Sequence, residues 1–291
     1  MNGVLVVDKP AGPTSFDVVR KVRHALSVKK VGHTGTLDPM ATGVLPICVG
    51  LSTRIAGYIT EGNKAYEAVV SLGRETDTQD ATGQAIREVP VPPFTREALE
   101  QALSRYRGTF EQVPPMYSAV KVGGKRLYEL ARAGEEVERK PRTVTVFELT
   151  LKDFGAEQLV LFVRCTKGFF VRTLAHELGR TLGCGAHLKA LRRTQSGPFM
   201  LDRALPLLEL LDLSQTESGR AVLLSRLVTE NEALSELAPL VVSADQVGAV
   251  SHGVPVEAHG QGRVRVVAPD GRLLAIADIE KGRLSYRRVL A

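Results

Sequence analysis

Residues 32–43 read GHTGTLDPMATG, a stretch too rich in Gly, Thr and Pro to form a helix or a central strand. We therefore predict a shaped loop. Pro39 restricts the preceding residue, Asp38, to extended backbone angles, so the loop holds this carboxylate in a fixed direction. The glycines at 32, 35 and 43 predict a backbone bent so that a substrate can come close. The alternative is a tight connection in which Asp38 is merely solvated.

Positive charge is concentrated directly before this loop. The chain has 291 residues and a net charge of +6, with 44% hydrophobic and 24% charged residues, as in an ordinary globular protein. Residues 18–37 contain no Asp or Glu, yet five Lys and Arg residues fall there: Arg20, Lys21, Arg23, Lys29 and Lys30. This pattern predicts a polyanionic partner. The alternative is a solvated basic helix face.

Several classes of protein are excluded by missing motifs. The three cysteines, Cys48, Cys165 and Cys184, lack metal-site spacing and are predicted to be reduced core thiols. The chain contains neither a P-loop nor a Rossmann glycine pattern, and its histidines lack the spacing of a zinc site. The first ten residues are typical of a strand and a turn, not of a signal peptide, and no apolar run reaches the length of a membrane span. We expect a cytoplasmic protein without metal or cofactor.

Hydrophobic periodicity predicts a mixture of helices and strands. We expect strands at 3–7, 66–72, 143–151 and 158–165, the last two as an antiparallel pair, and helices at 16–27, 96–107 and 171–182. In the first helix Ser15 is expected to cap the start, and Phe16, Val19, Val22 and Leu26 to face inward. Residues 114–142 are basic and flexible and are predicted to form an exposed insertion. Residues 204–237 read as a helical bridge. The Pro269-Asp270-Gly271 turn predicts a hairpin inside a small β domain from about residue 238.

A lone carboxylate in a fixed loop suits nucleophilic or general-base chemistry without a cofactor. Such a group needs a positive neighbour to stay ionised when a substrate excludes water, and Arg172 and Arg54 are the candidates. With the basic surroundings, the residues favour an enzyme that extrudes a base from RNA or DNA and stacks it on an aromatic ring. Tyr66 and Phe170 are candidates for that ring, although either is equally suited to the core. Asp77 or Asp80 remains possible as a second carboxylate.

The loop closely resembles the catalytic motif of the TruB family of tRNA pseudouridine synthases. Further landmarks follow in family order: Asp8-Lys9-Pro10, Lys64-Ala65-Tyr66, residues 76–80 (TDTQD), residues 114–121 (PPMYSAVK), residues 167–173 (KGFFVRT) and Leu191-Arg192-Arg193. Together they span residues 3–197. The resemblance implies an α+β pseudouridine synthase fold, a mixed and mainly antiparallel sheet flanked by helices and loops. It implies a catalytic domain over 1–237 and a small β-barrel-like PUA domain that binds RNA over 238–291.

The resemblance also implies an activity and its residues. The family isomerises the uridine at position 55 of the tRNA T arm, without cofactor or metal. Carried over residue by residue, Asp38 matches the catalytic aspartate, Tyr66 the tyrosine that stacks on the flipped base, and Arg172 the arginine that pairs with the aspartate. Leu191 matches an apolar wall of the pocket, and His33 a histidine that supports base flipping. Attack at C6, attack at C1′ and proton removal at C2′ all remain open for Asp38.

The remaining candidates extend this site outward. Further substrate contacts are expected from Lys9, Gly35, Thr36, Lys64 and Phe170. Surface contacts with RNA are expected from Arg20, Lys21, Lys121, Lys125, Arg126, Arg142, Arg192 and Arg193. Phe170 departs from the family, where many bacterial members have Tyr, so the C5 proton is expected to leave through Tyr66 or water.

The expected partner is the T-arm stem-loop of tRNA, bound by a monomer that needs neither a membrane nor an obligate protein partner. Two alternatives share the scaffold. One is the guide-RNA-dependent synthase subunit of archaea and eukaryotes, and the other is a non-catalytic protein that binds or folds RNA. The bacterial appearance of the insertion and the intact Asp38, Tyr66 and Arg172 favour the stand-alone enzyme.

Overall fold

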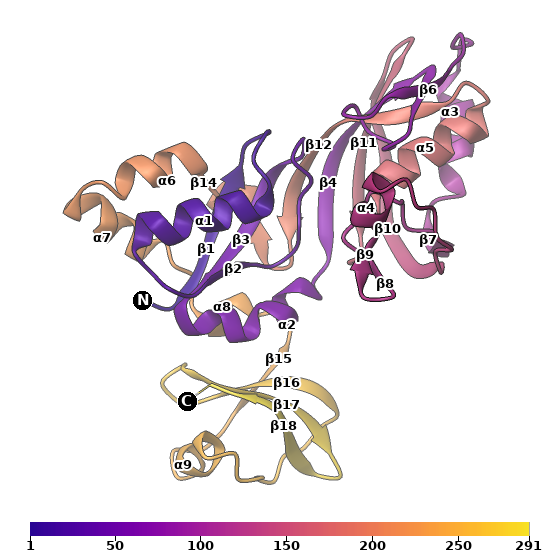
Figure 1. The fold of residues 1–291 in the computed structure, drawn as a ribbon. Helices are drawn as coiled ribbons and strands as arrows, with labels where there is room; N and C mark the ends of the chain where they lie inside the picture. The colour runs from indigo at the N-terminus through magenta and orange to yellow at the C-terminus, as the bar shows by residue number, and fades with distance from the viewer. Residues whose placement is uncertain (291) are drawn as a thin grey trace. The chain divides into compact units, whose positions relative to one another are not determined.

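The computed structural model describes residues 1–290, which divide into two compact units (Figure 1). Unit 1 comprises Met1–Asp38, Val44–Gly62 and the residues from Ser196 onward. Unit 2 comprises Pro39–Gly43 and Asn63–Gln195. The 32–43 stretch therefore changes unit between Asp38 and Pro39. In the part of the chain that the structure describes, no helix combines the length and apolar character needed to cross a bilayer.

Unit 1 begins with a small mixed sheet and its covering helices. Its strands are β1 (Gly3–Lys9), β2 (Val31–His33), β3 (Thr42–Val49) and β14 (Leu205–Pro206), in the order β14-β1-β3 with β2 antiparallel to β3. Only the first two residues of β3 belong to unit 2. Helix α1 (Ser15–Leu26) packs beside β2 and against α6 (Leu207–Leu213), which α7 (Glu217–Ser225) follows. Short elements complete this part: η1 (Gly50–Ile55), α2 (Ala56–Thr60), β13 (Phe199–Met200), η2 (Leu201–Arg203) and α8 (Glu230–Ala233).

Helix α1 corrects two details of the sequence interpretation. Thr14, not Ser15, is the N-cap: its hydroxyl accepts from the Asp17 amide at 3.1 Å, and the Asp17 carboxylate accepts from the Thr14 amide at 2.9 Å. Ser15 is instead buried as the first helical residue. Phe16 is 58% exposed, because the buried face of the helix is formed by Val18, Val19, Val22 and Ala25.

The C-terminal part of unit 1 is a four-stranded sheet. Its strands are β15 (Ala238–Val241), β16 (Gly262–Val267), β17 (Leu273–Glu280) and β18 (Arg283–Val289), with α9 (Gln246–Ser251) between the first two. The hairpin predicted at the Pro269-Asp270-Gly271 turn is confirmed as β16–β17. β15 and β18 are edges in the described residues, so this sheet is open and the barrel-like form is not seen. The sheet encloses its own buried cluster around Val266 and Ala275, while Ile276 of β17 shares a cluster with Val4 and Phe199. The domain boundary at 237/238 stays a prediction.

Unit 2 is a second sheet region with the order β12-β4-β11-β10-β7. Its strands are β4 (Lys64–Leu72), β7 (Gly108–Gln112), β10 (Arg142–Phe154), β11 (Gln158–Cys165) and β12 (Ala186–Ser196). The pairs β4–β11, β11–β10 and β10–β7 are antiparallel, whereas β12 pairs in parallel with Thr42 and Gly43 of β3. The expected mixed, mainly antiparallel sheet is confirmed, as is the pairing of the strands predicted at 143–151 and 158–165.

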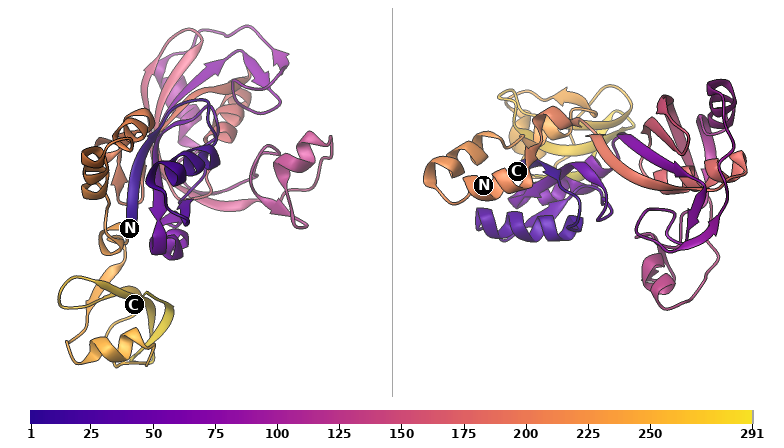
Figure 2. Two further views of the ribbon diagram at one scale, coloured as in Figure 1. Left: turned by 60° about the vertical axis from the view of Figure 1, so that its left-hand side comes forward. Right: turned by 90° about the horizontal axis from the view of Figure 1, so that it is seen from above.

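Two helices accompany this sheet. Helices α3 (Arg96–Ser104) and α5 (Val171–Leu182) pack on each other, α3 against β10 and α5 against β4. α5 has the predicted bounds, and Gly183 ends it with a left-handed φ of 82°. The predicted insertion forms a small hairpin, β8 (Lys121–Val122) and β9 (Lys125–Arg126), followed by α4 (Leu127–Arg132). Figure 2 shows that α4 projects away from the strands of unit 2. The short pair β5 (Arg74–Thr76) and β6 (Ala85–Glu88) completes the unit.

All three cysteines are buried, as expected for core thiols. Burial raises the pKa of the Cys48 and Cys165 thiols to about 12, so both stay protonated at neutral pH. They serve packing and carry no nucleophilic chemistry.

Candidate active site

The loop that carries Asp38 is fixed to the start of α1. The Ser15 hydroxyl accepts from the Leu37 amide at 2.8 Å and donates to the Leu37 carbonyl at 3.0 Å. The Leu37 side chain is 3% exposed, so the residue before Asp38 is fixed by both hydrogen bonds and packing. Gly35 adopts φ = 118°, a conformation that residues with a Cβ rarely take. Asp38 itself is partly exposed, and it directly follows the fixed residue Leu37.

The other site residues predicted in unit 1 differ in how far they are exposed. His33 ends β2 opposite Ile47 of β3, and Thr36 is exposed. Lys9 corrects the expectation of a substrate contact: its side chain is fully buried, and its ammonium donates to the Pro10 carbonyl at 3.0 Å. Arg20 and Lys21 are exposed on α1, as expected of surface contacts, and Arg54, the alternative partner for Asp38, is exposed on η1.

The end of the same motif is built into unit 2. Thr42 and Gly43 pair with Arg192 and Arg193 of β12. Gly43 has φ = 101°, and a Cβ at this position would lie 2.2 Å from the Arg193 carbonyl oxygen. The Thr42 hydroxyl lies 3.3 Å from an Arg192 amino group and 3.4 Å from the Leu191 carbonyl oxygen. Only glycine permits this approach of the two strands, so the motif places Leu191, Arg192 and Arg193 in a fixed register.

Arg193 corrects the sequence interpretation. The basic run predicts a surface contact with RNA, but the side chain is 1% exposed and is among the largest fully buried side chains of the protein. It is hydrogen-bonded to Tyr66, which stands on β4 opposite Val163 of β11. Burial lowers the pKa of the Arg193 guanidinium, and the interaction with Tyr66 offsets part of that effect. The structure thus brings together a predicted stacking ring and a buried cation.

Arg172 is buried at the N-terminal end of α5, where a cation opposes the helix dipole. Its side chain is 7% exposed, and one amino group lies 3.5 Å from an Asp80 carboxylate oxygen. The other amino group donates to the Tyr117 carbonyl at 2.9 Å. These contacts hold the guanidinium in place and counter its unfavourable position. The expected pairing of Arg172 with Asp38 stays a prediction.

Asp80, a possible second carboxylate by sequence, has a structural role. Its side chain is 5% exposed and accepts from the Thr78 hydroxyl at 2.8 Å, the Thr82 hydroxyl at 2.6 Å and the Thr82 amide at 2.9 Å. The Thr and Asp pattern of residues 76–82 is the sequence signal for this network. A carboxylate that accepts three hydrogen bonds and lies beside an arginine is held in its ionised form, so it serves to position its partners and not as a general acid. Asp77 is likewise committed to a turn, accepting from the Thr78 and Gln84 amides.

Phe170 is positioned by a residue that the sequence interpretation missed. Gln112 is 2% exposed; its side-chain oxygen accepts from the Phe170 amide at 2.8 Å, and its amide nitrogen donates to the Phe170 carbonyl at 3.2 Å. Gln112 ends β7, so this pair of bonds ties the start of α5 to the edge of the sheet. No local pattern marks Gln112, since its partner is 58 residues away.

The insertion carries exposed basic residues beside an aromatic ring. Lys121, Lys125 and Arg126 are exposed, while Lys64 on β4 is 5% exposed. The Arg126 and Arg132 guanidiniums lie 5.8 and 5.6 Å from the centre of the Tyr128 ring.

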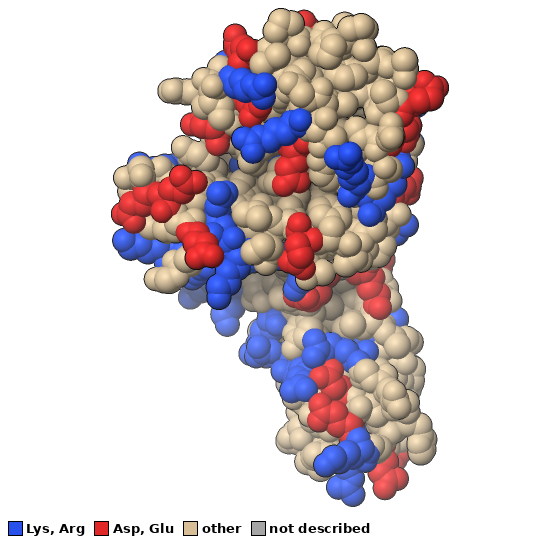
Figure 3. Space-filling model, turned by 90° about the vertical axis from the view of Figure 1, so that its right-hand side faces the viewer, with Lys and Arg blue, Asp and Glu red and all other residues tan. Residues whose placement is uncertain are grey.

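The surface charge is mixed. On the face shown in Figure 3, Lys and Arg side chains form separate patches among Asp and Glu. The net charge of +6 therefore does not produce one continuous basic surface on that face. Within residues 1–290, no cluster of three or more His, Cys, Asp or Glu side chains is arranged to hold a metal ion.

Known families match most of the chain. The TruB family pseudouridylate synthase (N terminal domain) matches residues 23–171, and the tRNA pseudouridylate synthase B C-terminal domain matches residues 172–235. A protein named tRNA pseudouridine synthase B from Pseudomonas paraeruginosa is 46% identical over 294 residues, which cover 100% of this chain and 96% of that protein. One of the same name from Symbiobacterium thermophilum is 51% identical over 257 residues, which cover 87% of this chain and 83% of that protein.

Solved structures match over nearly the whole length as well. A chain in the crystal structure of a Cbf5-Nop10-Gar1 complex superposes with a TM-score of 0.79 at 26% identity, covering 99% of this chain and 85% of that chain. A chain in the archaeal box H/ACA sRNP Nop10-Cbf5 complex gives a TM-score of 0.76 at 23% identity. These matches confirm the fold class expected from the sequence.

The approach of Gly43 to Arg193 predicts a large loss of stability in Gly43→Ala. We expect an unfolding free energy lower by more than about 3 kcal/mol, because the added Cβ combines backbone strain with a clash against a carbonyl. Gly12→Ala is the matched control, since Gly12 has φ = 106° but nothing within 4 Å of its Cβ position. Its loss should be about 1–2 kcal/mol. Chemical denaturation of both variants measures the difference. Equal losses would show that β3 and β12 can move apart at Gly43 without a loss of stability.

Proposed function

Because the chain belongs to the TruB family of pseudouridylate synthases, we propose that it converts uridine 55 in the T arm of tRNA to pseudouridine. The observation that carries the proposal is the full-length match to tRNA pseudouridine synthase B proteins, with Asp38, Tyr66 and Arg172 present in this chain. The reaction breaks the bond between N1 and C1′, turns the base, joins C5 to C1′, and moves a proton from C5 to solvent while N1 gains one. Atoms and electrons balance without an oxidant, a reductant or a co-substrate, so no cofactor is needed.

Asp38 supplies the carboxylate of this reaction. The fixation of Leu37 by Ser15 on one side and the restriction imposed by Pro39 on the other support a preset direction for its side chain. Arg172 supplies the positive charge that keeps such a carboxylate ionised once the base has excluded water. The contacts of Arg172 with Asp80 and Tyr117 make it a prepositioned cation.

Tyr66 provides the ring on which the extruded base stacks, and its phenol oxygen takes the C5 proton while its own proton passes to solvent. The hydrogen bond with Arg193 supports the second role, because it holds the phenol oxygen in a fixed position. Phe170 cannot perform this step, since it lacks a hydroxyl. Leu191, on β12, supplies an apolar wall, and His33, Lys64, Gly35 and Thr36 contact the nucleotide or its neighbours. Lys9 is fully buried and has no part in these contacts.

The RNA is held mainly by exposed basic residues outside this centre. We assign that role to the insertion, to Arg20 and Lys21 of α1, to Arg142 and the partly exposed Arg192, and to the C-terminal sheet over residues 238–291 as a separate RNA-binding domain. The protein acts on the tRNA T arm as a monomer in the cytoplasm, without a protein partner. The relatives that match at full length carry the name of a tRNA enzyme, which supports this over a guide-RNA-dependent subunit.

Purified protein incubated with bulk tRNA in the presence of a chelator tests the activity. Mapping of pseudouridine should show a single new site in the T arm. Asp38→Asn should abolish the product, a loss of at least about 10³-fold, because the carboxylate takes part in bond making. Binding of a T-arm stem-loop should change less than about threefold, since the side chain keeps its shape. Substantial turnover by this variant would refute the assignment of Asp38.

Tyr66→Phe separates the two roles of the tyrosine. The ring and hence stacking remain, so we expect RNA affinity within about threefold of the parent, but turnover should fall at least about 10²-fold. The variant should also unfold about 1–3 kcal/mol more easily, because the buried Arg193 loses a hydrogen-bond partner. Single-turnover kinetics with 5-deuterated uridine gives the readout: a primary isotope effect in the parent indicates rate-limiting removal of the C5 proton. Near-normal turnover in Tyr66→Phe would assign that proton to water.

Removal of charge in the insertion should weaken binding. In Lys121→Gln/Lys125→Gln we expect the affinity for the T-arm stem-loop to fall about 3- to 10-fold, with a flatter dependence on salt concentration. Arg105→Gln/Lys152→Gln removes the same charge from exposed positions elsewhere in unit 2 and serves as control. Equal affinity and salt slope in the two double variants would make the insertion an ordinary surface loop.

A further inference from the structure

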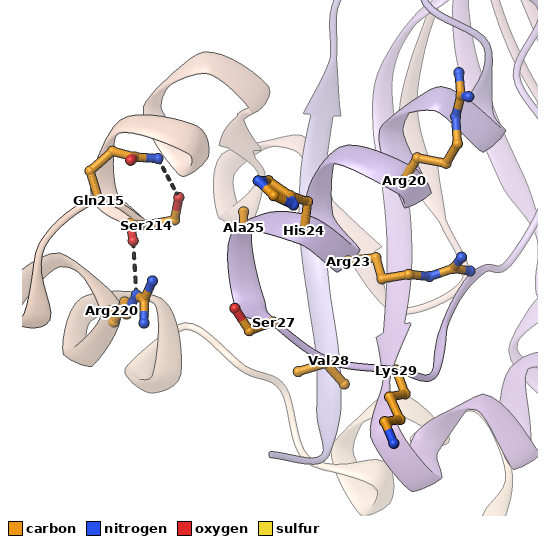
Figure 4. Close-up of a pocket in the computed structure, with 10 residues that line it drawn as sticks. All are labelled: Arg20, Arg23, His24, Ala25, Ser27, Val28, Lys29, Ser214, Gln215 and Arg220. Atoms are coloured by element: carbon orange, nitrogen blue, oxygen red, sulfur yellow. Dashed lines mark hydrogen bonds between the residues drawn. The ribbon is translucent and has the colours of Figure 1, made fainter.

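A second basic site lies in unit 1, at the C-terminal end of α1. A pocket of about 550 Å³ opens there between α1 and the turn that joins α6 to α7 (Figure 4). The pocket is basic, because its lining includes Arg20, Arg23, His24, Lys29 and Arg220. Among the described residues that line it there is no Asp or Glu. Figure 4 shows His24 and Arg220 on the side of Ser214, whereas Arg20 and Arg23 extend from the other side of α1 and Lys29 lies on the segment after the helix.

Most of this charge is not neutralised within the protein. Arg20 forms an ion pair with Asp17. In residues 1–290, no carboxylate lies within 4 Å of the charged groups of Arg23, Lys29 or Arg220. Three uncompensated cations around one pocket create a field that favours an anion.

The end of α1 does not explain these cations. Basic residues often compensate the carbonyls at a helix C-terminus. Here the Arg23 and His24 carbonyls accept from the backbone amides of Val28 and Ser27, at 3.2 and 3.1 Å, with Ser27 in a left-handed conformation at φ = 53°. Backbone groups thus complete this part of the cap, and the basic side chains remain available to a ligand.

Arg220 is prepared for such a ligand. Its Nε donates to the Ser214 carbonyl at 2.8 Å, which orients the guanidinium from α7. The two terminal amino groups, in the geometry that matches two oxygens of a phosphate, have no hydrogen bond to another residue in the described part of the chain. An arginine whose inner nitrogen is fixed and whose outer nitrogens are open is a typical phosphate-binding arrangement.

The position of the pocket defines which phosphates can reach it. Asp38 lies near the start of α1, because the preceding residue, Leu37, is hydrogen-bonded to Ser15, the first residue of the helix. Lys29 of the pocket lies just after the end of the same helix. Twelve helical residues rise roughly 18 Å. The phosphates of the flipped nucleotide itself therefore do not fill the pocket, and an extended RNA that contacts Asp38 has length to cover it.

We propose that this pocket binds backbone phosphates of the substrate RNA about one helix length away from the target nucleotide. The proposal rests on the proposed function for the identity of the RNA. The shared chemistry is that of a phosphate, which a small free polyphosphate could also supply, so the test has an arm for each source.

The test compares two double variants of the full chain. Arg23→Gln/Arg220→Gln removes two pocket cations, and Lys30→Gln/Arg226→Gln removes the same charge from exposed positions nearby that do not line the pocket. Binding of full-length tRNA is measured over a series of salt concentrations, and binding of inorganic triphosphate by calorimetry. In the pocket variant we expect affinity for tRNA to fall about 5- to 10-fold relative to the control variant, with a salt slope smaller by about 1 for each phosphate that is no longer neutralised. Turnover at saturating tRNA should be unchanged.

Two outcomes would overturn the proposal. Equal tRNA affinity and salt slope in both variants would show a solvated basic pocket. Loss of triphosphate binding with unchanged tRNA affinity would assign the pocket to a small free polyphosphate. Arg23→Lys/Arg220→Lys keeps the charge and should recover most of the tRNA affinity, and thermal melting checks that every variant folds. If the parent formed no pseudouridine, the proposed function would fail, but the binding comparison would still decide whether the pocket holds RNA.

Discussion

The backbone approach of Gly43 to the carbonyl of Arg193 is the constraint on which the rest of the site depends. It sets the register of Thr42 and Gly43 against Arg192 and Arg193 on β12. A shift by one residue would turn every side chain of the strand to the opposite face. The buried Arg193 would then be exposed, and Tyr66 would lose its partner. Gly43, the last glycine of the 32–43 motif, is therefore required by the strand that carries Arg193, the partner of Tyr66, as well as by the loop.

Two buried arginines distinguish unit 2 from an ordinary core. Each guanidinium loses its hydration when buried, a cost that only well-placed partners offset. Arg193 has Tyr66, and Arg172 has Asp80 and the Tyr117 carbonyl. Asp80 is itself held by Thr78 and Thr82. Tyr66 and Arg172, both proposed for chemistry, thus each have buried polar partners to which the proposed reaction gives no direct part. A substitution at Asp80 would act through Arg172, and its effect on activity would say nothing about a second catalytic carboxylate.

Much of the fold is accessible from the sequence, because its signals are local. The bounds of α5, the β10–β11 pair and the β16–β17 hairpin follow from hydrophobic periodicity and turn residues within a few positions of each element. Thr14 and Ser15 are both suitable caps by residue type, but only Thr14 has an acidic residue, Asp17, three positions later to complete a capping box. The hydroxyl of Ser15 instead bonds to Leu37, 22 residues away. Phe16 is a similar case. Its place in the apolar pattern predicts burial, yet the helix presents Val18 instead of Phe16 to the core.

The site is harder to predict, because its decisive contacts are long-range. Arg193 follows Arg192 in a basic run, and composition alone makes both residues surface contacts. Alternation along β12 separates them, since neighbouring strand residues face opposite sides: Arg193 turns into the protein and Arg192 remains partly exposed.

Positive charge therefore has two different uses in this chain. Buried guanidiniums cannot release counterions from RNA, so in the proposed function Arg172 serves the charge at the reacting base and Arg193 the position of Tyr66, and neither serves RNA affinity. In the proposed function, affinity for RNA comes from the exposed cations, which lie in the insertion, on α1 and around the pocket at its end. Net charge thus overstates the basic surface available to RNA. Salt concentration should act on the exposed group through binding and leave the buried group, and with it the chemical step, nearly unaffected.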